Sequence, residues 1–309
     1  MKTTDIILIS PPSRSVNHYR PPMALLYLAG HLQKNHLSVN IIDITLKEVI
    51  RDKKFTEKLP QKLAEIESQI IDQVKKFHPK IIGITCYTPE YQEVLQLAQK
   101  IKSLNPQIKI VVGGIHPTLY PEEFLLEINS PIDYEVIGEG EETFLELCQK
   151  LLLLNHHSFK SIRGLAFLTK KTVFKTPLRP LNDNLDTISH PAYNLIDMNY
   201  YTQASPYAIR GCFLRSFYLL ATRGCPSTCT FCVAKKLRQF NGGGSYTRVR
   251  SATSLIREIK HLRRQYQIDS FYLLTTYLLL IKIMWPNFAS FLKKKNSAYC
   301  GAVRPKFPP

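Results

Sequence analysis

The chain has 309 residues, with 41 Lys and Arg against 24 Asp and Glu, a net charge of +17 and 44% hydrophobic residues. This length suggests two domains, and the composition excludes a disordered, collagen-like or low-complexity chain. The longest apolar run, Phe271 to Ile281, is too short to span a membrane, and the first residues lack the apolar run of a signal peptide, so we expect a cytoplasmic protein without a transmembrane segment.

The first 154 residues alternate strand and helix patterns. Short apolar runs predict buried strands at residues 5–10, 39–43, 80–85, 108–112 and 134–137. Apolar residues at helical spacing predict helices between and after them, at residues 21–32, 63–77, 94–104 and 141–154. Five strands alternating with helices predict a doubly wound parallel sheet.

Ligands of such a sheet bind beyond the carboxyl ends of its strands. The loops expected there are residues 11–22, 85–89, 113–117 and 138–142, each with a Gly or Pro. Glycines would let a ligand approach the backbone closely. From the pattern alone, ordinary turns between strand and helix remain an equal alternative.

The second half of the chain begins with a connector. Residues 156–210 are predicted to be a linker that contains a small hairpin, with strands at residues 165–168 and 172–174. A new strand is predicted at residues 217–222, a helix capped by Ser251 follows, and Phe271 begins another strand. A weak helix is expected near residues 287–295. The predicted domains are therefore residues 1–155 and 211–309.

Three of the seven cysteines lie within eight positions, as Cys225, Cys229 and Cys232. Three thiolates on one short loop can hold three irons of a cubane cluster and leave the fourth iron open to an outside ligand. The alternative is a structural zinc site, which needs four ligands and would have to recruit Cys212.

The cysteine loop, Ala221 to Pro226 with Cys229, Phe231 and Cys232, resembles the signature of the radical S-adenosylmethionine (SAM) superfamily. Residues 21–29, 112–118 and 138–141 are similar to the cobalamin-binding domain of its B12-binding subfamily. The resemblance implies a Rossmann-like cobalamin-binding domain followed by the first βα units of a partial TIM-type radical SAM barrel.

The resemblance also implies cofactor sites. Cys225, Cys229 and Cys232 would be the metal ligands of a [4Fe–4S] cluster, with SAM on the remaining iron. Phe231 would lie near the SAM adenine, although a core aromatic under the loop is an equal alternative. The residues implied for cobalamin binding follow the predicted strands, and they are Thr85, Gly113, Gly114, Gly138, Glu139 and Gly140.

The sequence departs from the family in two places. The Asp-x-His-x-x-Gly loop that supplies a lower ligand to cobalamin is absent, so His ligation is doubtful; His18 stays a candidate, and His116 is expected to be a turn residue. Thr275 and Thr276 stand where the family usually has an acidic pair. The chain after Phe217 is shorter than the family's partial barrel, so we expect a C-terminally truncated protein.

Three functions follow as hypotheses. The first is a cobalamin-dependent radical SAM enzyme that acts as a methyltransferase or catalyses a radical rearrangement or cyclisation. Its substrate would be an unknown small or lipid-like molecule, and its electron donor would be a protein such as flavodoxin or ferredoxin. The second is a non-catalytic remnant that binds cobalamin or a cluster. The third, a basic zinc or nucleic-acid module, lacks interleaved aromatic and basic residues, so nucleic acid is not expected as a partner.

Overall fold

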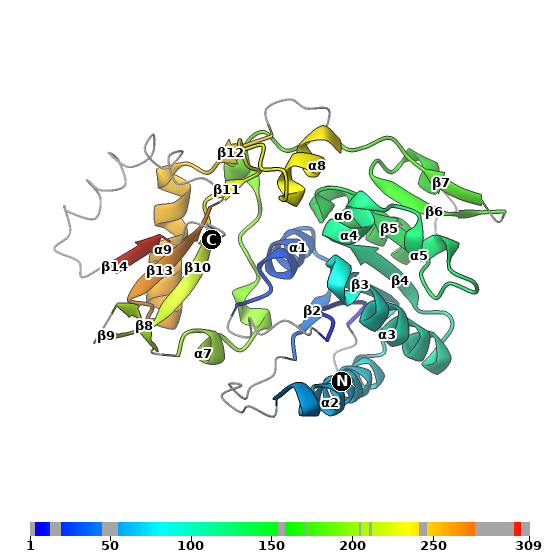
Figure 1. The fold of residues 1–309 in the computed structure, drawn as a ribbon, viewed down its shortest axis with the longest axis horizontal. Coiled ribbons are helices and arrows are strands. Elements are labelled where there is room, and N and C mark those ends of the chain that lie inside the picture. Colours follow the sequence, from blue (N-terminus) through cyan, green and yellow to red (C-terminus); the bar gives the residue numbers. More distant parts are fainter. Residues whose placement is uncertain are drawn as a thin grey trace. The chain divides into compact units, whose positions relative to one another are not determined.

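The computed structural model describes residues 4–12, 20–44, 55–153, 158–170, 172–203, 205–209, 212–240, 246–275 and 300–303. The chain divides into two compact units, residues 1–179 with 191–196 and residues 180–190 with 197–309 (Figure 1). Among the helices of the described part, none has both the length and the apolar character to cross a lipid bilayer.

The first unit is built on a seven-stranded sheet with the order β2-β1-β3-β4-β5-β6-β7. Its strands are β1 (Ile6–Ile9), β2 (Val39–Ile42), β3 (Ile81–Thr85), β4 (Lys109–Gly113), β5 (Tyr134–Val136), β6 (Leu165–Thr169) and β7 (Thr172–Lys175). The first five strands are parallel, and Ile6 of β1 lies opposite both Val39 and Ile81. The strand order reverses at β1, as in doubly wound folds.

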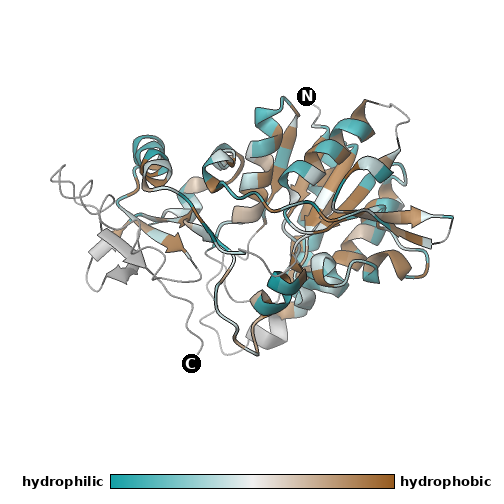
Figure 2. Ribbon diagram, turned by 90° about the horizontal axis from the view of Figure 1, so that it is seen from above, coloured by the Kyte–Doolittle hydropathy of each residue, from teal (hydrophilic) through white to brown (hydrophobic). Residues whose placement is uncertain are grey.

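Helices cover both faces of this sheet, with the strands between them (Figure 2). They are α1 (Met23–Lys34), α2 (Phe55–Phe77), α3 (Tyr91–Leu104), α4 (Ile115–Leu119), α5 (Glu123–Leu126) and α6 (Gly140–Leu152). The structure packs α1 beside α6 and α2 beside α3. This pairing follows from right-handed crossovers on the two sides of the reversal at β1.

The core of the first unit lies along the central strands. All four residues of β1 are fully buried, as expected for a parallel strand covered on both faces. Gly83 of β3 brings α6 close to the sheet, because a Cβ at this position would lie 2.9 Å from Leu8 Cδ2 and 3.0 Å from Phe144 Cζ. The strands are accordingly hydrophobic in Figure 2, whereas the outer sides of the helices are hydrophilic.

The hairpin that the sequence analysis assigned to the linker continues this sheet. Strand β6 runs antiparallel to β5, with Leu165 opposite Val136 and Ala166 opposite Glu135, and β7 then pairs with β6. Leu165 and Ala166 are fully buried. The first compact unit therefore extends beyond residue 155, because backbone pairing and burial attach the hairpin to the edge of the sheet.

The second unit contains a smaller parallel sheet with the order β10-β13-β14. Its described elements are α7 (Met198–Tyr201), β8 (Ser205–Ile209), β9 (Cys212–Leu214), β10 (Ser216–Leu220), β11 (Thr222–Arg223), α8 (Val233–Phe240), β12 (Arg248–Val249), α9 (Ala252–Tyr266), β13 (Ser270–Leu274) and β14 (Cys300–Val303). The weak helix predicted near residues 287–295 lies outside the described residues.

The first βα unit of this sheet is formed as predicted. Strand β10 and strand β13 are parallel, with Phe217 opposite Phe271, and both of these side chains are buried. Helix α9 connects the strands and buries Leu255 and Ile259. Ser251 caps the helix, since its side chain accepts a hydrogen bond from the backbone N–H of Ser254.

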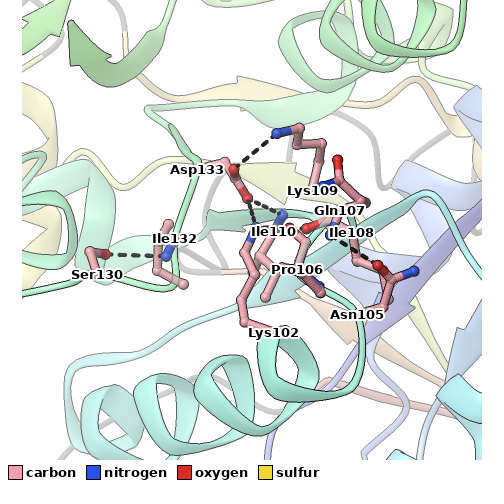
Figure 3. Close-up of polar contacts among 10 residues, drawn as sticks. All are labelled: Lys102, Asn105, Pro106, Gln107, Ile108, Lys109, Ile110, Ser130, Ile132 and Asp133. Atoms are coloured by element: carbon pink, nitrogen blue, oxygen red, sulfur yellow. Dashed lines mark hydrogen bonds and ion pairs between the residues drawn. The ribbon is translucent and has the colours of Figure 1, made fainter. Parts of the chain in front are cut away.

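At the amino ends of β4 and β5, one carboxylate ties three segments of the first unit together (Figure 3). Asp133 accepts a hydrogen bond from the backbone N–H of Ile110 at 2.8 Å and pairs with Lys102 at 2.7 Å and with Lys109 at 3.4 Å. Lys102, on α3, also donates to the carbonyl oxygen of Ile108 at 2.7 Å. Asp133 therefore links α3, β4 and the entry to β5.

We expect Asp133→Ala to lower the free energy of unfolding by about 2 kcal/mol, because it removes the acceptor of the Ile110 backbone N–H and the negative charge beside the half-buried Lys102 ammonium. Urea unfolding of the full chain measures the change. Asp72→Ala is the matched control, since the exposed pair between Asp72 and Lys75 should contribute less than about 0.5 kcal/mol. Equal losses in the two variants would contradict this account.

Candidate functional site

The carboxyl edge of the first sheet is where its fold places a ligand. In a doubly wound sheet, the loops on either side of the strand-order reversal form the crevice. Here these are the loops after β1 and β3, and part of the first one, residues 13–19, lies outside the described residues together with His18. The described part of the edge contains the loops after β3, β4 and β5. The six residues implied for cobalamin lie in these loops or at the ends of the adjoining elements, since Thr85 ends β3, Gly113 ends β4 and Gly140 begins α6.

Backbone hydrogen bonds join the loops after β3 and β4. The N–H of Cys86 donates to the carbonyl oxygen of Gly113 at 2.8 Å, and the N–H of His116 donates to the carbonyl oxygen of Cys86 at 3.1 Å. Gly114 between them has a φ of +109°, and a Cβ there would lie 2.9 Å from the Cys86 carbonyl oxygen and 3.1 Å from Thr85 Oγ1. Only glycine fits this crossing without strain.

Thr118 extends the network to the loop after β5. Its hydroxyl donates to the carbonyl oxygen of Gly114 at 2.6 Å and accepts from the N–H of Gly138 at 3.0 Å. Gly138 has a φ of +85° with nothing within 4 Å of where a Cβ would lie. The backbone at Gly138 is therefore not covered by side chains, which would allow a large ligand to approach it closely.

The structure therefore brings Thr85, Gly113, Gly114 and Gly138 into one connected set of loops. Glu139 and Gly140 continue from Gly138 into α6, and both are half-buried. Thr118 ends the stretch of residues 112–118 that resembles a cobalamin-binding domain, but the sequence analysis did not name it as a site residue. Its role depends on the spatial meeting of two loops.

His116 lies beneath these loops and its side chain is 3% exposed. Nδ1 lies 3.2 Å from the hydroxyl of Thr88, and Nε2 lies 2.9 Å from a carboxylate oxygen of Glu123. Burial lowers the pKa of His116, and the Glu123 carboxylate opposes that shift. With both ring nitrogens engaged inside the fold, His116 has a structural role, but it lies in the short helix α4 and not in the turn that the sequence analysis expected.

A buried acid that the sequence analysis did not single out lies on the same side of the sheet. Glu135 of β5 is fully buried, and its Oε1 accepts a hydrogen bond from the backbone N–H of Leu125 at 3.2 Å. Burial raises the pKa of the Glu135 carboxyl to about 8, against the hydrogen bonds from Leu125 and Phe124. At neutral pH this carboxyl is therefore mostly protonated. The signal in the sequence is one charged residue inside an apolar strand.

In the second unit, the cysteine loop follows directly from the carboxyl end of β10 and the short strand β11. Cys225, Cys229 and Cys232 are all free thiols; Cys225 is half-buried, and the other two are exposed. The N–H of Cys232 donates to the carbonyl oxygen of Cys229 at 3.2 Å. Phe231 is 74% exposed, so it is not a core aromatic under the loop.

The donor set has the chemistry of an iron–sulfur site: three unpaired thiols on one loop, with no disulfide among them. Within the described ranges, no three His, Cys, Asp or Glu side chains are grouped closely enough to surround one metal ion. Binding of a cluster at these cysteines therefore requires their sulfur atoms to be drawn together. The side chain of Cys212, the fourth ligand of the zinc alternative, lies outside the described residues.

Gly224, just before the first cysteine, is required by a close backbone contact. Its φ is +80°, and a Cβ at this position would overlap the carbonyl group of Tyr246. Tyr246 precedes β12, which pairs antiparallel with β11 through Thr222 and Arg223. Thr222 also donates through its hydroxyl to the Thr275 hydroxyl at 3.1 Å. Thr276 lies outside the described residues.

Most of the first unit is similar to a known domain family. The B12 binding domain family matches residues 12–148. These residues contain the strands β2 to β5 and the connected loops described above. The predicted resemblance is confirmed as a resemblance, because the chain is 27% identical over 159 residues to the cobalamin-dependent radical SAM methyltransferase TokK of Streptomyces tokunonensis, covering 50% of this chain and 22% of that protein.

The chain is 33% identical over 274 residues to an uncharacterized methyltransferase of Pyrococcus horikoshii, covering 87% of this chain and 52% of that protein. It is similar in structure to the radical S-adenosylmethionine methyltransferase TsrM of Kitasatospora setae, with a TM-score of 0.66, 19% identity and coverage of 96% and 52%.

For the cobalamin-dependent S-adenosylmethionine radical enzyme OxsB, the TM-score is 0.69 at 18% identity, with coverage of 97% and 38%. The predicted fold class, a doubly wound parallel α/β sheet followed by the first βα units of a second parallel sheet, is thereby confirmed. The chain spans about half the length of the curated relative.

The exposure of the cysteines predicts their reactivity. Burial raises the pKa of Cys86 to about 12, with Glu90, Glu135 and Glu93 adding to the shift, and burial raises the pKa of Cys148 as well. Under native conditions we expect N-ethylmaleimide to modify Cys229 and Cys232 at least about tenfold faster than these two. Peptide mass spectrometry measures the rates, and equal modification of Cys86 and Cys229 would contradict the structure.

Glu135 predicts a pH dependence of stability. Its pKa is about 8 in the folded protein against an ordinary value of 4.5, so its favourable contribution is present below pH 4.5 and is lost as pH rises through about 8. Glu135→Gln should be more stable than the parent at pH 8.5, by a few kcal/mol at most, and the difference should shrink towards pH 5. Urea unfolding at several pH values measures it; a pH-independent difference would refute this assignment.

Proposed function

We propose that this chain is the cobalamin- and SAM-binding part of a radical SAM enzyme that transfers a methyl group, with radical rearrangement or cyclisation as the related alternative. The observation that carries the proposal is the loop of three free cysteines at the carboxyl end of a parallel strand, in a chain whose residues 12–148 match the B12 binding domain family. The names of similar proteins, which include methyltransferases, support the same class of reaction.

In the first unit, the connected loops after β3, β4 and β5 would line cobalamin. Gly113 and Gly114 present backbone rather than side chain at the edge, and Gly138 leaves open space beside it. The hydroxyl of Thr118 fixes the relative positions of Gly114 and Gly138 through its two hydrogen bonds. Thr85, Glu139 and Gly140 would complete this wall. His18 remains the candidate for a lower ligand.

In the second unit, Cys225, Cys229 and Cys232 would hold a [4Fe–4S] cluster, and Phe231 would contact SAM. When bound, the cluster and SAM supply a one-electron cleavage of the sulfonium, and cobalamin supplies a methyl carrier. The exposed side chain of Phe231, next to two exposed thiols, suits contact with a ligand at the same loop. Substrate contacts would come from other parts of the protein.

An electron donor such as flavodoxin or ferredoxin would be needed. Helix α8 begins directly after Cys232 and contains Lys235, Lys236 and Arg238, and the two lysines are exposed. Positive charge next to the cysteine loop suits an acidic redox protein, since opposite charges accelerate encounter. The proposed substrate is a small or lipid-like molecule.

The main competing function is a non-catalytic remnant that binds cobalamin or a cluster without turnover. One observation favours it: Thr275 stands in place of an acidic residue, and its hydroxyl is bonded to Thr222 within the fold. Anaerobic incubation with SAM and dithionite separates the two functions. Release of 5′-deoxyadenosine supports the enzyme, whereas a bound cluster with no release supports the remnant.

Cys229→Ala tests the cluster assignment. Anaerobic reconstitution should give the parent chain about four irons and an absorption band at about 400 nm. The variant should show neither the iron nor the band, because two thiolates are too few to bind the cluster. Cys148→Ala, at a buried cysteine of the first unit, is the matched control and should keep its iron. Aquacobalamin binding should persist in Cys229→Ala. Full iron content in that variant would overturn the assignment.

A further inference from the structure

We propose that Arg250, held by Glu258, is the positioning residue that fixes the cysteine loop for cluster binding. The inference rests on the proposed function and adds a residue to it. Arg250 lies 25 positions after Cys225 in the sequence, and nothing in the spacing of the cysteines indicates it. Its role follows from what its backbone and guanidinium contact.

Arg250 grips the end of the strand that delivers the loop. Its backbone N–H donates to the carbonyl oxygen of Ala221 at 2.9 Å, and Nη1 donates to the carbonyl oxygen of Leu220 at 3.1 Å. Nη1 also pairs with Glu258 at 2.5 Å, and Nη2 donates to the hydroxyl of Ser254 at 2.9 Å. One side chain thus ties β10 to two residues of α9.

The ion pair between Arg250 and Glu258 is buried, so each of its charges must be compensated within the fold. The side chain of Arg250 is 6% exposed and that of Glu258 is 0% exposed. A buried guanidinium is tolerated only when its charge is compensated and its donors are used. The planar fork of arginine serves several acceptors at once, whereas the single ammonium of lysine cannot reach the same set. The site therefore requires arginine specifically.

Arg250 belongs to residues 246–251, here called the clamp segment, which lie beside residues 222–224 at the start of the cysteine loop. Tyr246 lies against Gly224, and Arg248 and Val249 pair with β11. The clamp segment is anchored on its far side as well, because Arg248 donates to the carbonyl oxygen of Asn182 at 2.9 Å and the N–H of Ser251 donates to Asp186 at 2.8 Å.

The loop is also tied after its last cysteine. Arg238 of α8 donates through Nη2 to the carbonyl oxygen of Cys225 at 2.6 Å. The backbone is therefore fixed at Ala221, Gly224 and Cys225, whereas Cys229 and Cys232 are exposed. Because Arg250 and the clamp segment fix the backbone up to Cys225, only the thiols of Cys229 and Cys232 have to move to complete a ligand set. Residues that orient metal ligands in this way commonly contribute about 10- to 100-fold to metal affinity.

The test uses the full 309-residue chain after anaerobic reconstitution. Arg250→Lys keeps the charge but loses the fork. Because Arg250→Ala would strand the buried Glu258 carboxylate, the second variant is the double substitution Arg250→Met with Glu258→Leu, which removes both charges together. Lys102→Met, which breaks an ion pair of the first unit, is the matched control. Circular dichroism and thermal melting of the apo-proteins verify folding.

The readouts are iron per chain, the rate of iron loss to a chelator and the electron paramagnetic resonance signal of the reduced cluster. In both Arg250 variants we expect iron loss to be about tenfold faster and the signal to broaden, with apo-protein folding retained. Lys102→Met should match the parent. A folded double variant with the parent's iron retention and signal would overturn the role of Arg250. Absence of a cluster in the parent would instead overturn the proposed function.

Discussion

Parallel strand pairing decides where chemistry can occur in this protein. In a parallel sheet every strand ends at the same edge, so residues distant in sequence are delivered to one place. At this edge of the first unit lie Thr85, Gly114 and Gly138, each at the end of one of three successive strands or shortly after it. The second unit repeats the arrangement on a smaller scale, since the cysteine loop leaves the carboxyl end of β10 beside β13. Both candidate sites depend on the same geometric rule.

The two edges are stabilised in different ways. In the first unit, the loops bond to one another: Cys86 to Gly113, His116 to Cys86, and Thr118 to both Gly114 and Gly138. These contacts exist within the apo fold and preorganise the surface that a ligand meets. In the second unit, most of the contacts named above lie before and beside the cysteines, and among them the N–H of Cys232 donates to the carbonyl oxygen of Cys229. The cluster proposed for this loop would have to supply part of the order itself, as is usual when ligands assemble around an ion.

The sequence predicted the elements whose residues repeat regularly. The strands from β1 to β5, helix α9 with its Ser251 cap, and β13 all follow from apolar periodicity and local capping chemistry. The three cysteines could be recognised as candidate ligands for a related reason, because that prediction depends only on their spacing within one short loop. Local patterns were therefore sufficient both for the regular core and for the candidate ligands.

What the sequence did not reveal depends on contacts between distant segments. The hairpin of β6 and β7 reads as part of a linker until Leu165 is seen opposite Val136. Arg250 reads as one more basic residue in a chain of net charge +17 until its partner Glu258 and the carbonyl oxygen of Leu220 are in place. Such roles have no periodicity and no fixed spacing, so only the fold identifies them.

The two buried carboxyls show how much the surroundings decide. Glu135 has backbone donors but no cation among its described contacts, so burial raises its pKa and favours the neutral acid. Glu258 faces the guanidinium of Arg250, which compensates a negative charge directly. The first arrangement costs stability when the proton leaves, whereas the second costs stability when either partner is removed. A charged residue inside an apolar pattern therefore indicates a structural constraint. Its nearest partner determines whether the residue is held as a neutral, protonated group or as a member of an ion pair that fixes a loop.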